Sequence, residues 1–185
     1  MKLAFIDIET TGLNPLKHEI IELGCIIADS KTFEVYGKLN FKIKPQFIKK
    51  ADPKALLING YNETDWKDAM SLMKALMFFA EAVEGSTLVG HNIIFDWSFL
   101  RIALENEMVD KYFKVPKYKI DTISLAWGKI PHSKVQSWSL KTICTYLGIP
   151  PEDDTHRALA GAEKCFEVYK KLMEIKCNST NTNAK

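Results

Sequence analysis

The hydrophobic residues in the first part of the chain form short runs rather than helical stripes. Residues 3–8 are an apolar run with the character of a central buried strand. Two further runs, residues 20–28 and 34–43, are rich in β-branched and aromatic side chains and are separated by a short polar turn. This pattern predicts an antiparallel hairpin that joins the first strand.

After Pro45 the hydrophobic spacing changes from that of strands to that of helices. Pro53 begins a short helical segment, and apolar residues at helical spacing predict a long amphipathic helix over residues 66–84. Later patterns predict strands at residues 86–89 and 119–122 and helices at residues 95–108, 139–147 and 156–175. The order predicts an α/β fold with a mixed sheet flanked by helices, in which sites gather at the carboxyl ends of central strands.

Length and composition limit what the chain can be. It has 185 residues, of which 46% are hydrophobic and 26% are charged, so a disordered or coiled-coil protein is excluded. We expect one domain at residues 1–176 and a disordered polar tail at residues 177–185. No apolar run is long enough to span a bilayer and no secretory signal is present, so we expect a cytoplasmic protein without membrane contact.

The net charge and the aromatic residues do not by themselves indicate a nucleic-acid-binding protein. The net charge is only +2, whereas a domain that holds a phosphate backbone by charge alone is usually far more basic. We expect the four tryptophans to anchor the core, with base stacking as the alternative. They are Trp66, Trp97, Trp127 and Trp138. A nucleic-acid function therefore needs a local site.

Two carboxylates stand at the end of the first predicted strand. Asp7 and Glu9 are two residues apart, so they point to the same face of the strand, roughly 7 Å apart. The run contains no lysine or arginine to neutralise them, and oxygen ligands of this kind suit a pair of Mg²⁺ or Mn²⁺ ions. The alternative is a strand whose end emerges into solvent.

Two further segments carry chemistry at the ends of predicted elements. Asp96 falls in the first turn of a helix that directly follows a strand, where a simple interaction with the helix dipole is the alternative explanation. His156 lies in a polar loop before the last helix and is a candidate general base. An ordinary surface histidine is the alternative for that residue.

Together these segments resemble a known family. The chain is similar to the DEDD exonucleases with a catalytic histidine, which include the proofreading ε subunit of bacterial DNA polymerase III, ribonuclease T and oligoribonuclease. The matching segments follow the family's order over nearly the whole chain. They are residues 5–12 (FIDIETTG), 20–24 (IIELG), 52–60 (DPKALLING), 90–96 (GHNIIFD), 121–122 (DT) and 156–160 (HRALA).

The resemblance implies a ribonuclease H-like five-stranded mixed sheet and two-metal hydrolysis of phosphodiester bonds from a 3′ end. Asp7, Glu9 and Asp96 would bind two Mg²⁺ or Mn²⁺ ions, and His156 would deprotonate the attacking water. A further set of residues would hold the terminal nucleotide. This substrate-binding set is Thr10, Thr11, Gly12, Leu13, His91, Asn92 and Phe95.

The resemblance also implies partners. The substrate would be the 3′ end of single-stranded DNA or RNA, and a polymerase subunit is a candidate partner in DNA repair or proofreading. The sequence does not distinguish a DNA substrate from an RNA substrate. It also does not distinguish a monomer from a homodimer.

One position departs from the family's pattern. The family has an aspartate ligand five residues after the histidine, where this chain has Gly161. Close packing among neighbouring alanines is one explanation for the glycine, and natural or engineered loss of activity is the other. The leading hypothesis is therefore a 3′ to 5′ exonuclease with impaired activity. The rival is an inactive nucleic-acid-binding or polymerase-associated module.

Overall fold

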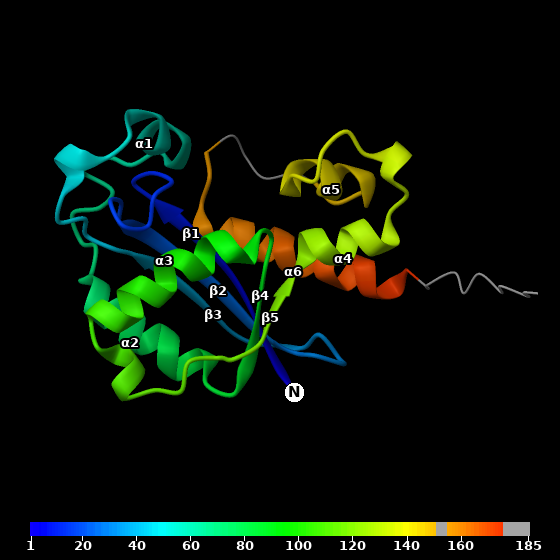
Figure 1. Cartoon of the computed structure of the whole chain (residues 1–185), viewed down its shortest axis with the longest axis horizontal. Helices are drawn as coiled ribbons and strands as arrows, with labels where there is room; N and C mark the ends of the chain where they lie inside the picture. The colour runs from blue at the N-terminus through cyan, green and yellow to red at the C-terminus, as the bar shows by residue number, and fades with distance from the viewer. Residues whose placement is uncertain (151–154, 176–185) are drawn as a thin grey trace, which may run out of the picture.

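A five-stranded mixed sheet organises the chain (Figure 1). The structure is a computed structural model that describes residues 1–150 and 155–175. The strands are β1 (Lys2–Thr10), β2 (Ile20–Asp29), β3 (Val35–Lys42), β4 (Ser86–Gly90) and β5 (Lys119–Asp121), in the spatial order β3-β2-β1-β4-β5. The first three strands are antiparallel, whereas β1, β4 and β5 run parallel. The predicted ribonuclease H-like α/β fold is confirmed.

Helices cover both faces of the sheet (Figure 1). The α-helices are α1 (Pro53–Asn59), α2 (Leu72–Val83), α3 (Ile93–Asn106), α4 (Thr122–Lys129), α5 (Leu140–Tyr146) and α6 (Ala158–Glu174). Three short 3₁₀ turns are η1 (Ile48–Lys50), η2 (Val109–Lys111) and η3 (His132–Lys134). One core cluster joins the sheet to α2 and α3, and a second joins it to α6.

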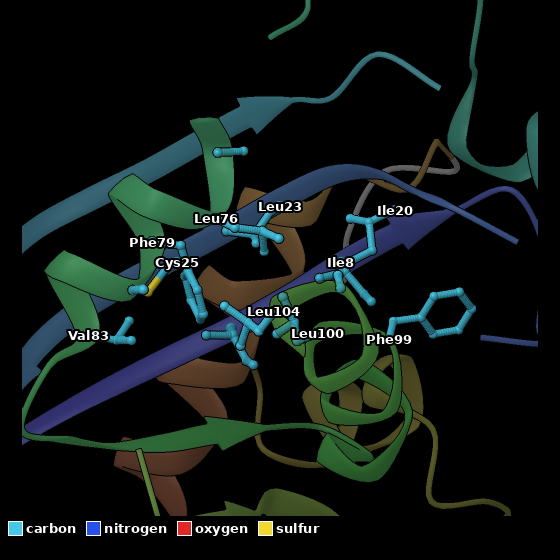
Figure 2. Close-up of a cluster of buried hydrophobic side chains, with 14 of the residues drawn as sticks. Ile8, Ile20, Leu23, Cys25, Leu76, Phe79, Val83, Phe99, Leu100 and Leu104 are labelled. Carbon is cyan, nitrogen blue, oxygen red and sulfur yellow. The ribbon is translucent and has the colours of Figure 1, made fainter. Parts of the chain in front are cut away.

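The alternation of side chains along β1 determines which face carries the carboxylates. Ile6 and Ile8 pack on the α2 and α3 side, in the cluster that Figure 2 shows around Phe79 and Leu100. Leu3 and Phe5 point to the opposite face, where Phe5 contacts aromatic rings of α6. Because successive strand residues alternate, Asp7 and Glu9 continue this second set toward α6.

The predicted helix over residues 66–84 is wrong in its first part. The helix α2 begins only at Leu72, where the Ser71 side chain accepts a hydrogen bond from the Lys74 amide. Trp66 is 3% exposed, and its indole N–H donates to the Ile21 carbonyl 2.9 Å away. The apolar spacing before Ser71 therefore reflects docking against the sheet rather than helical periodicity.

Helix α4 was not predicted, and α6 begins later than expected. The Asp121 carboxylate accepts the Ile123 amide at 2.7 Å, so this residue caps a helix directly after the short strand β5. The predicted helix over residues 156–175 begins at Ala158 in the structure. His156 consequently lies outside the helix, in the segment that leads into it.

Two expectations concern the chain as a whole. No helix within residues 1–150 and 155–175 is both long and apolar enough to cross a bilayer. The predicted tail at residues 177–185 lies outside the described residues, as do Asp153 and Asp154. The domain boundary at residue 176 stays a prediction.

Candidate active site

A cavity of 280 Å³ opens at the carboxyl end of β1, between α1, α3 and the beginning of α6. It brings together residues that are far apart in the sequence. The predicted site residues that line it are Asp7, Glu9, Thr10, Gly12, Leu13, His91, Asn92, Phe95, Asp96, His156 and Gly161. Thr11 does not line the cavity; its side chain is buried and accepts the Glu19 amide at 2.9 Å.

Asp96 lines the cavity and links α3 to β1 through a hydrogen bond. The side chain is 3% exposed, and its Oδ1 accepts the Ile8 amide at 3.1 Å. Burial raises the pKa of Asp96 to about 8, and the negative charge of Asp121 contributes to that rise. A buried carboxylate of this kind is costly unless a cation approaches it, as the predicted metal site requires.

The turn between β4 and α3 has a strained backbone that brings Asp96 to the cavity. Asn92 caps α3 with φ 67° and ψ 47°, a left-handed conformation that asparagine tolerates better than most residues. The backbone amide of Asn92 donates to the Asp121 carboxylate at 3.4 Å. The sharp reversal places Asp96 in the first turn of α3, directly beyond the end of the strand.

The loop after β1 forms another wall of the cavity. The Thr10 hydroxyl donates to the Gly12 carbonyl at 2.8 Å, which closes a tight turn. Gly12 has φ 155°, and a Cβ atom there would lie 2.6 Å from the His18 ring. Leu13 follows with 80% of its surface exposed. The turn thus presents an apolar side chain at the mouth of the cavity.

His91 lines the cavity, but both of its ring nitrogens are engaged within the protein. Nδ1 lies 2.9 Å from the Thr122 hydroxyl and Nε2 lies 2.8 Å from the Trp138 carbonyl. Since a carbonyl only accepts, Nε2 carries the proton. Burial lowers the pKa of His91, and the hydrogen bond to Trp138 and the charge of Asp121 oppose that change. The side chain therefore connects the cavity wall to the segment before α5.

The beginning of α6 is fixed against β2, and this contact places His156. Gly24 on β2 has no room for a side chain, because a Cβ atom there would overlap the Ala158 backbone. The buried Glu22 carboxylate accepts the Ala158 amide and lies 3.4 Å from Arg157 Nη1. Desolvation raises the pKa of Glu22, and the Arg157 charge opposes that rise.

A chain of hydrogen bonds extends this anchor to α1 and β1. Arg157 Nη1 also lies 3.4 Å from the Asn59 carbonyl, and the Asn59 side chain donates to the Thr10 carbonyl at 3.1 Å. The His156 amide donates to the Ile58 carbonyl at 3.1 Å. The four elements that surround the cavity are thus held to one another by buried or partly buried polar contacts.

We expect Gly24→Ala to lower the free energy of unfolding by about 1–3 kcal/mol, because the added methyl group must displace the α6 backbone. Urea denaturation followed by circular dichroism measures this change. Gly37→Ala on the adjacent strand is the matched control, since a Cβ atom there meets nothing within 4 Å. Equal stability of the two variants would contradict the close approach of α6 to β2.

No role was predicted from the sequence for three residues that support the cavity, namely Glu22, Asn59 and Asp121. Glu22 and Asp121 lie within segments that match the exonuclease family, and Asn59 ends the matching α1 segment. A charged residue inside the otherwise apolar run of residues 20–28 was the available signal for Glu22. The Asp-Thr pair at residues 121–122 was the available signal for a capped helix.

The carboxylates around the cavity have the chemistry of a site for hard divalent cations. Asp7, Glu9 and Asp96 supply only oxygen donors, which suit Mg²⁺ and Mn²⁺. Among residues 1–150 and 155–175 no three acidic, histidine or cysteine side chains are already gathered into a ligand cage. Gly161 is buried at the cavity wall and contributes no donor. The donor set fits the predicted ions in kind but lacks the fourth carboxylate.

Comparisons with known proteins show the family of the chain. The model of the exonuclease family RNase_T matches residues 4–169. A DNA polymerase III of the PolC type from Thermotoga petrophila is 32% identical over 171 residues, which cover 92% of this chain and 12% of that protein. Ribonuclease T from Shewanella baltica is 28% identical over 178 residues, covering 89% of this chain and 78% of the relative.

Solved structures share the fold. Exonuclease I from E. coli, in complex with a dT13 oligonucleotide, superposes with a TM-score of 0.80 at 20% identity. The match covers 94% of this chain and 41% of the exonuclease. The chain thus spans only a small part of the PolC-type polymerase and less than half of exonuclease I. Since the family model covers most of the sequence, the chain belongs to the RNase_T exonuclease family.

Proposed function

We propose that this protein is a metal-dependent 3′ to 5′ exonuclease that hydrolyses phosphodiester bonds at single-stranded nucleic-acid ends. The observation that carries the proposal is the single cavity that joins Asp7, Glu9, Asp96 and His156. Its relatives support the choice of reaction, since they include ribonuclease T and a fold neighbour crystallised with single-stranded DNA. The PolC-type relative supports a polymerase as a candidate partner.

The residues around the cavity have separate tasks in this proposal. Asp7, Glu9 and Asp96 hold two Mg²⁺ or Mn²⁺ ions, which activate a water and stabilise the charge on the leaving oxygen when bound. His156 is exposed and accepts the proton of the attacking water. Leu13 contacts the terminal base, and the backbone amides of Thr10 and Gly12 face the 3′ hydroxyl. Asn92 and Phe95 line the same cavity. Thr11 supports this turn from beneath.

A second candidate function rests on Gly161. This residue lines the cavity where the family has an aspartate, so the chain has three carboxylates in place of four. A protein that kept the cavity but lost the fourth ligand would bind 3′ ends without shortening them. The exonuclease proposal therefore includes impaired activity, and the second candidate is a binding module that is fully inactive.

A metal titration with a labelled substrate separates the two candidates. Single-stranded DNA and RNA of matched sequence are incubated with the protein at increasing Mn²⁺ or Mg²⁺, and products are resolved by length. Stepwise shortening from the 3′ end supports the exonuclease. Retention of the ends without shortening at any metal concentration supports the binding module and contradicts the exonuclease.

We expect Asp7→Ala to abolish cleavage and to weaken Mn²⁺ binding, because the cavity offers only three carboxylates for the proposed ions and this change removes one of them. Calorimetric titration with Mn²⁺ and product analysis measure the two effects. Asp110→Ala is a suitable control, since Asp110 lies in η2 away from the cavity. A purified Asp7→Ala protein that cleaves as fast as the parent would refute the metal assignment.

A further inference from the structure

The surface beside the cavity, formed by α4, η3 and α5, differs in charge from the rest of the chain. Of the 185 residues 23 are acidic, yet residues 122–150 contain none. The same stretch contains three lysines. The Lys129 ammonium donates a hydrogen bond to the Ile175 carbonyl at 2.8 Å, whereas Lys134 and Lys141 are exposed. A local positive charge without carboxylates favours a polyanionic ligand.

Three aromatic rings gather on this surface. The Trp127 ring centroid lies 4.0 Å from that of His132 and 4.8 Å from that of Trp138. Trp127 is 53% exposed and belongs to none of the core clusters among the described residues, so it is not a core residue. Trp138 is half-buried and packs against the cluster of α4, α5 and α6. Trp127 therefore presents aromatic surface that the core does not use.

This aromatic surface continues directly from the cavity. Leu140 lines the cavity and begins α5, two residues after Trp138. The Trp138 carbonyl also accepts the hydrogen bond from His91 on the cavity wall. Figure 1 shows α5 across from α1, on the other side of the end of β1. The segment that carries Trp138 thus connects the cavity wall to the aromatic rings.

We infer that Trp127, with Lys134 and Lys141, forms a second binding site for single-stranded nucleic acid, which holds nucleotides upstream of the 3′ end. Proteins that bind single strands without sequence preference combine cationic side chains with aromatic rings on which bases stack. Both features occur here, next to the cavity, in a stretch of sequence (residues 122–150) that contains no acidic residue. The inference rests on the proposed function, because the 3′ end of the same strand occupies the cavity.

The test measures binding without cleavage. Fluorescence anisotropy is recorded with labelled oligothymidylates of increasing length, in EDTA, on the full chain. We expect the affinity of the parent to rise with length and Trp127→Ala to remove most of this rise, roughly a 5- to 150-fold loss per stacked base on the longest strand. The shortest oligonucleotides should bind both proteins equally. Trp127→Phe should keep most of the affinity because it retains a ring.

The lysines give a second readout that does not depend on the tryptophan. Replacing Lys134 and Lys141 by alanine should reduce the slope of log K against log salt by about 0.7 for each phosphate that a lysine no longer neutralises. Tyr36→Ala and Lys31→Ala are matched controls, since both side chains are exposed on β3 or in the turn that precedes it. Neither control should change the length dependence or the salt slope.

Several results would overturn the inference. Parent-like affinity of Trp127→Ala for long strands, or an equal decrease in Tyr36→Ala, would show that no upstream nucleotide stacks on this surface. A polyglutamate chain that binds as tightly as the oligonucleotide would point to an acidic protein partner instead. Failure of the exonuclease proposal gives a different result. In that case the protein does not shorten ends in the presence of metal, but Trp127→Ala still weakens the binding of long strands in EDTA.

Discussion

Gly161→Asp is expected to raise the rate of 3′-end shortening by at least about 100-fold. Loss of an outer-shell partner already costs roughly 10- to 100-fold in metal affinity or activity, and a direct ligand contributes at least as much. Gly161 lies at the cavity wall together with Asp7, Asp96 and His156. An aspartate at this position therefore adds the one carboxylate that the family's pattern requires.

The stability of this variant should change little. Gly161 is the fourth residue of α6, and its amide donates to the Arg157 carbonyl at 2.9 Å. Removing a helical glycine gains up to about 1 kcal/mol, and a negative charge near a helix N-terminus adds a few tenths. Repulsion from the other carboxylates opposes both effects without metal.

Calorimetry with Mn²⁺ and product analysis on DNA and RNA measure the two consequences of Gly161→Asp. Gly161→Asn is the matched control, because it has nearly the same size and carries no charge. Tighter Mn²⁺ binding and faster shortening are expected for the aspartate variant alone. If the parent already shortens ends as fast as Gly161→Asp, another group supplies the missing ligand and Gly161 is not the defect.

His156→Ala is expected to slow hydrolysis by roughly 10² to 10⁴, which is the usual contribution of a general base. Binding of the 3′ end should persist, because the backbone contact of His156 with Ile58 does not need the ring. The comparison is made in the Gly161→Asp background, where the rate is high enough to measure.

The His156→Ala test combines single-turnover rates with affinity in EDTA. Tyr112→Ala is the control, since Tyr112 is also exposed but directly follows η2, away from the cavity and from the aromatic surface of α4 and α5. A collapse of affinity with an unchanged rate per bound substrate would make His156 a binding residue and contradict its assignment as the base.

The five strands and their sequence along the chain were predictable because local patterns determine them. The apolar run of β1 and the two carboxylates that follow it required only strand alternation and the chemistry of oxygen ligands. The segment around Asp96 was predictable for the same reason, since a strand end leads directly into a helix. Metal binding itself and the roles of the site residues stay predictions.

The errors arose where distant contacts override local pattern. Trp66 has the spacing of a helical residue, but its indole is held by the Ile21 carbonyl, 45 positions away. Helix α4 is short and contains Gly128, so only its Asp121 cap and its packing on α6 indicate it. The exposure of Trp127 also depends on tertiary structure, because nothing in its neighbours along the chain distinguishes it from a core tryptophan.

The ion pair between Glu22 and Arg157 has a consequence for when the protein gains its function. The two residues are 135 positions apart, so the contact that places His156 closes one of the longest loops in the chain. Contacts of such separation form late in folding, since loop-closure entropy opposes them until other structure is present. Before α6 has docked, a nascent chain thus carries three carboxylates, while His156 is not yet held beside them. The cavity is complete only when the last helix has docked, because His156 and Gly161 line it from the beginning of that helix and the segment before it.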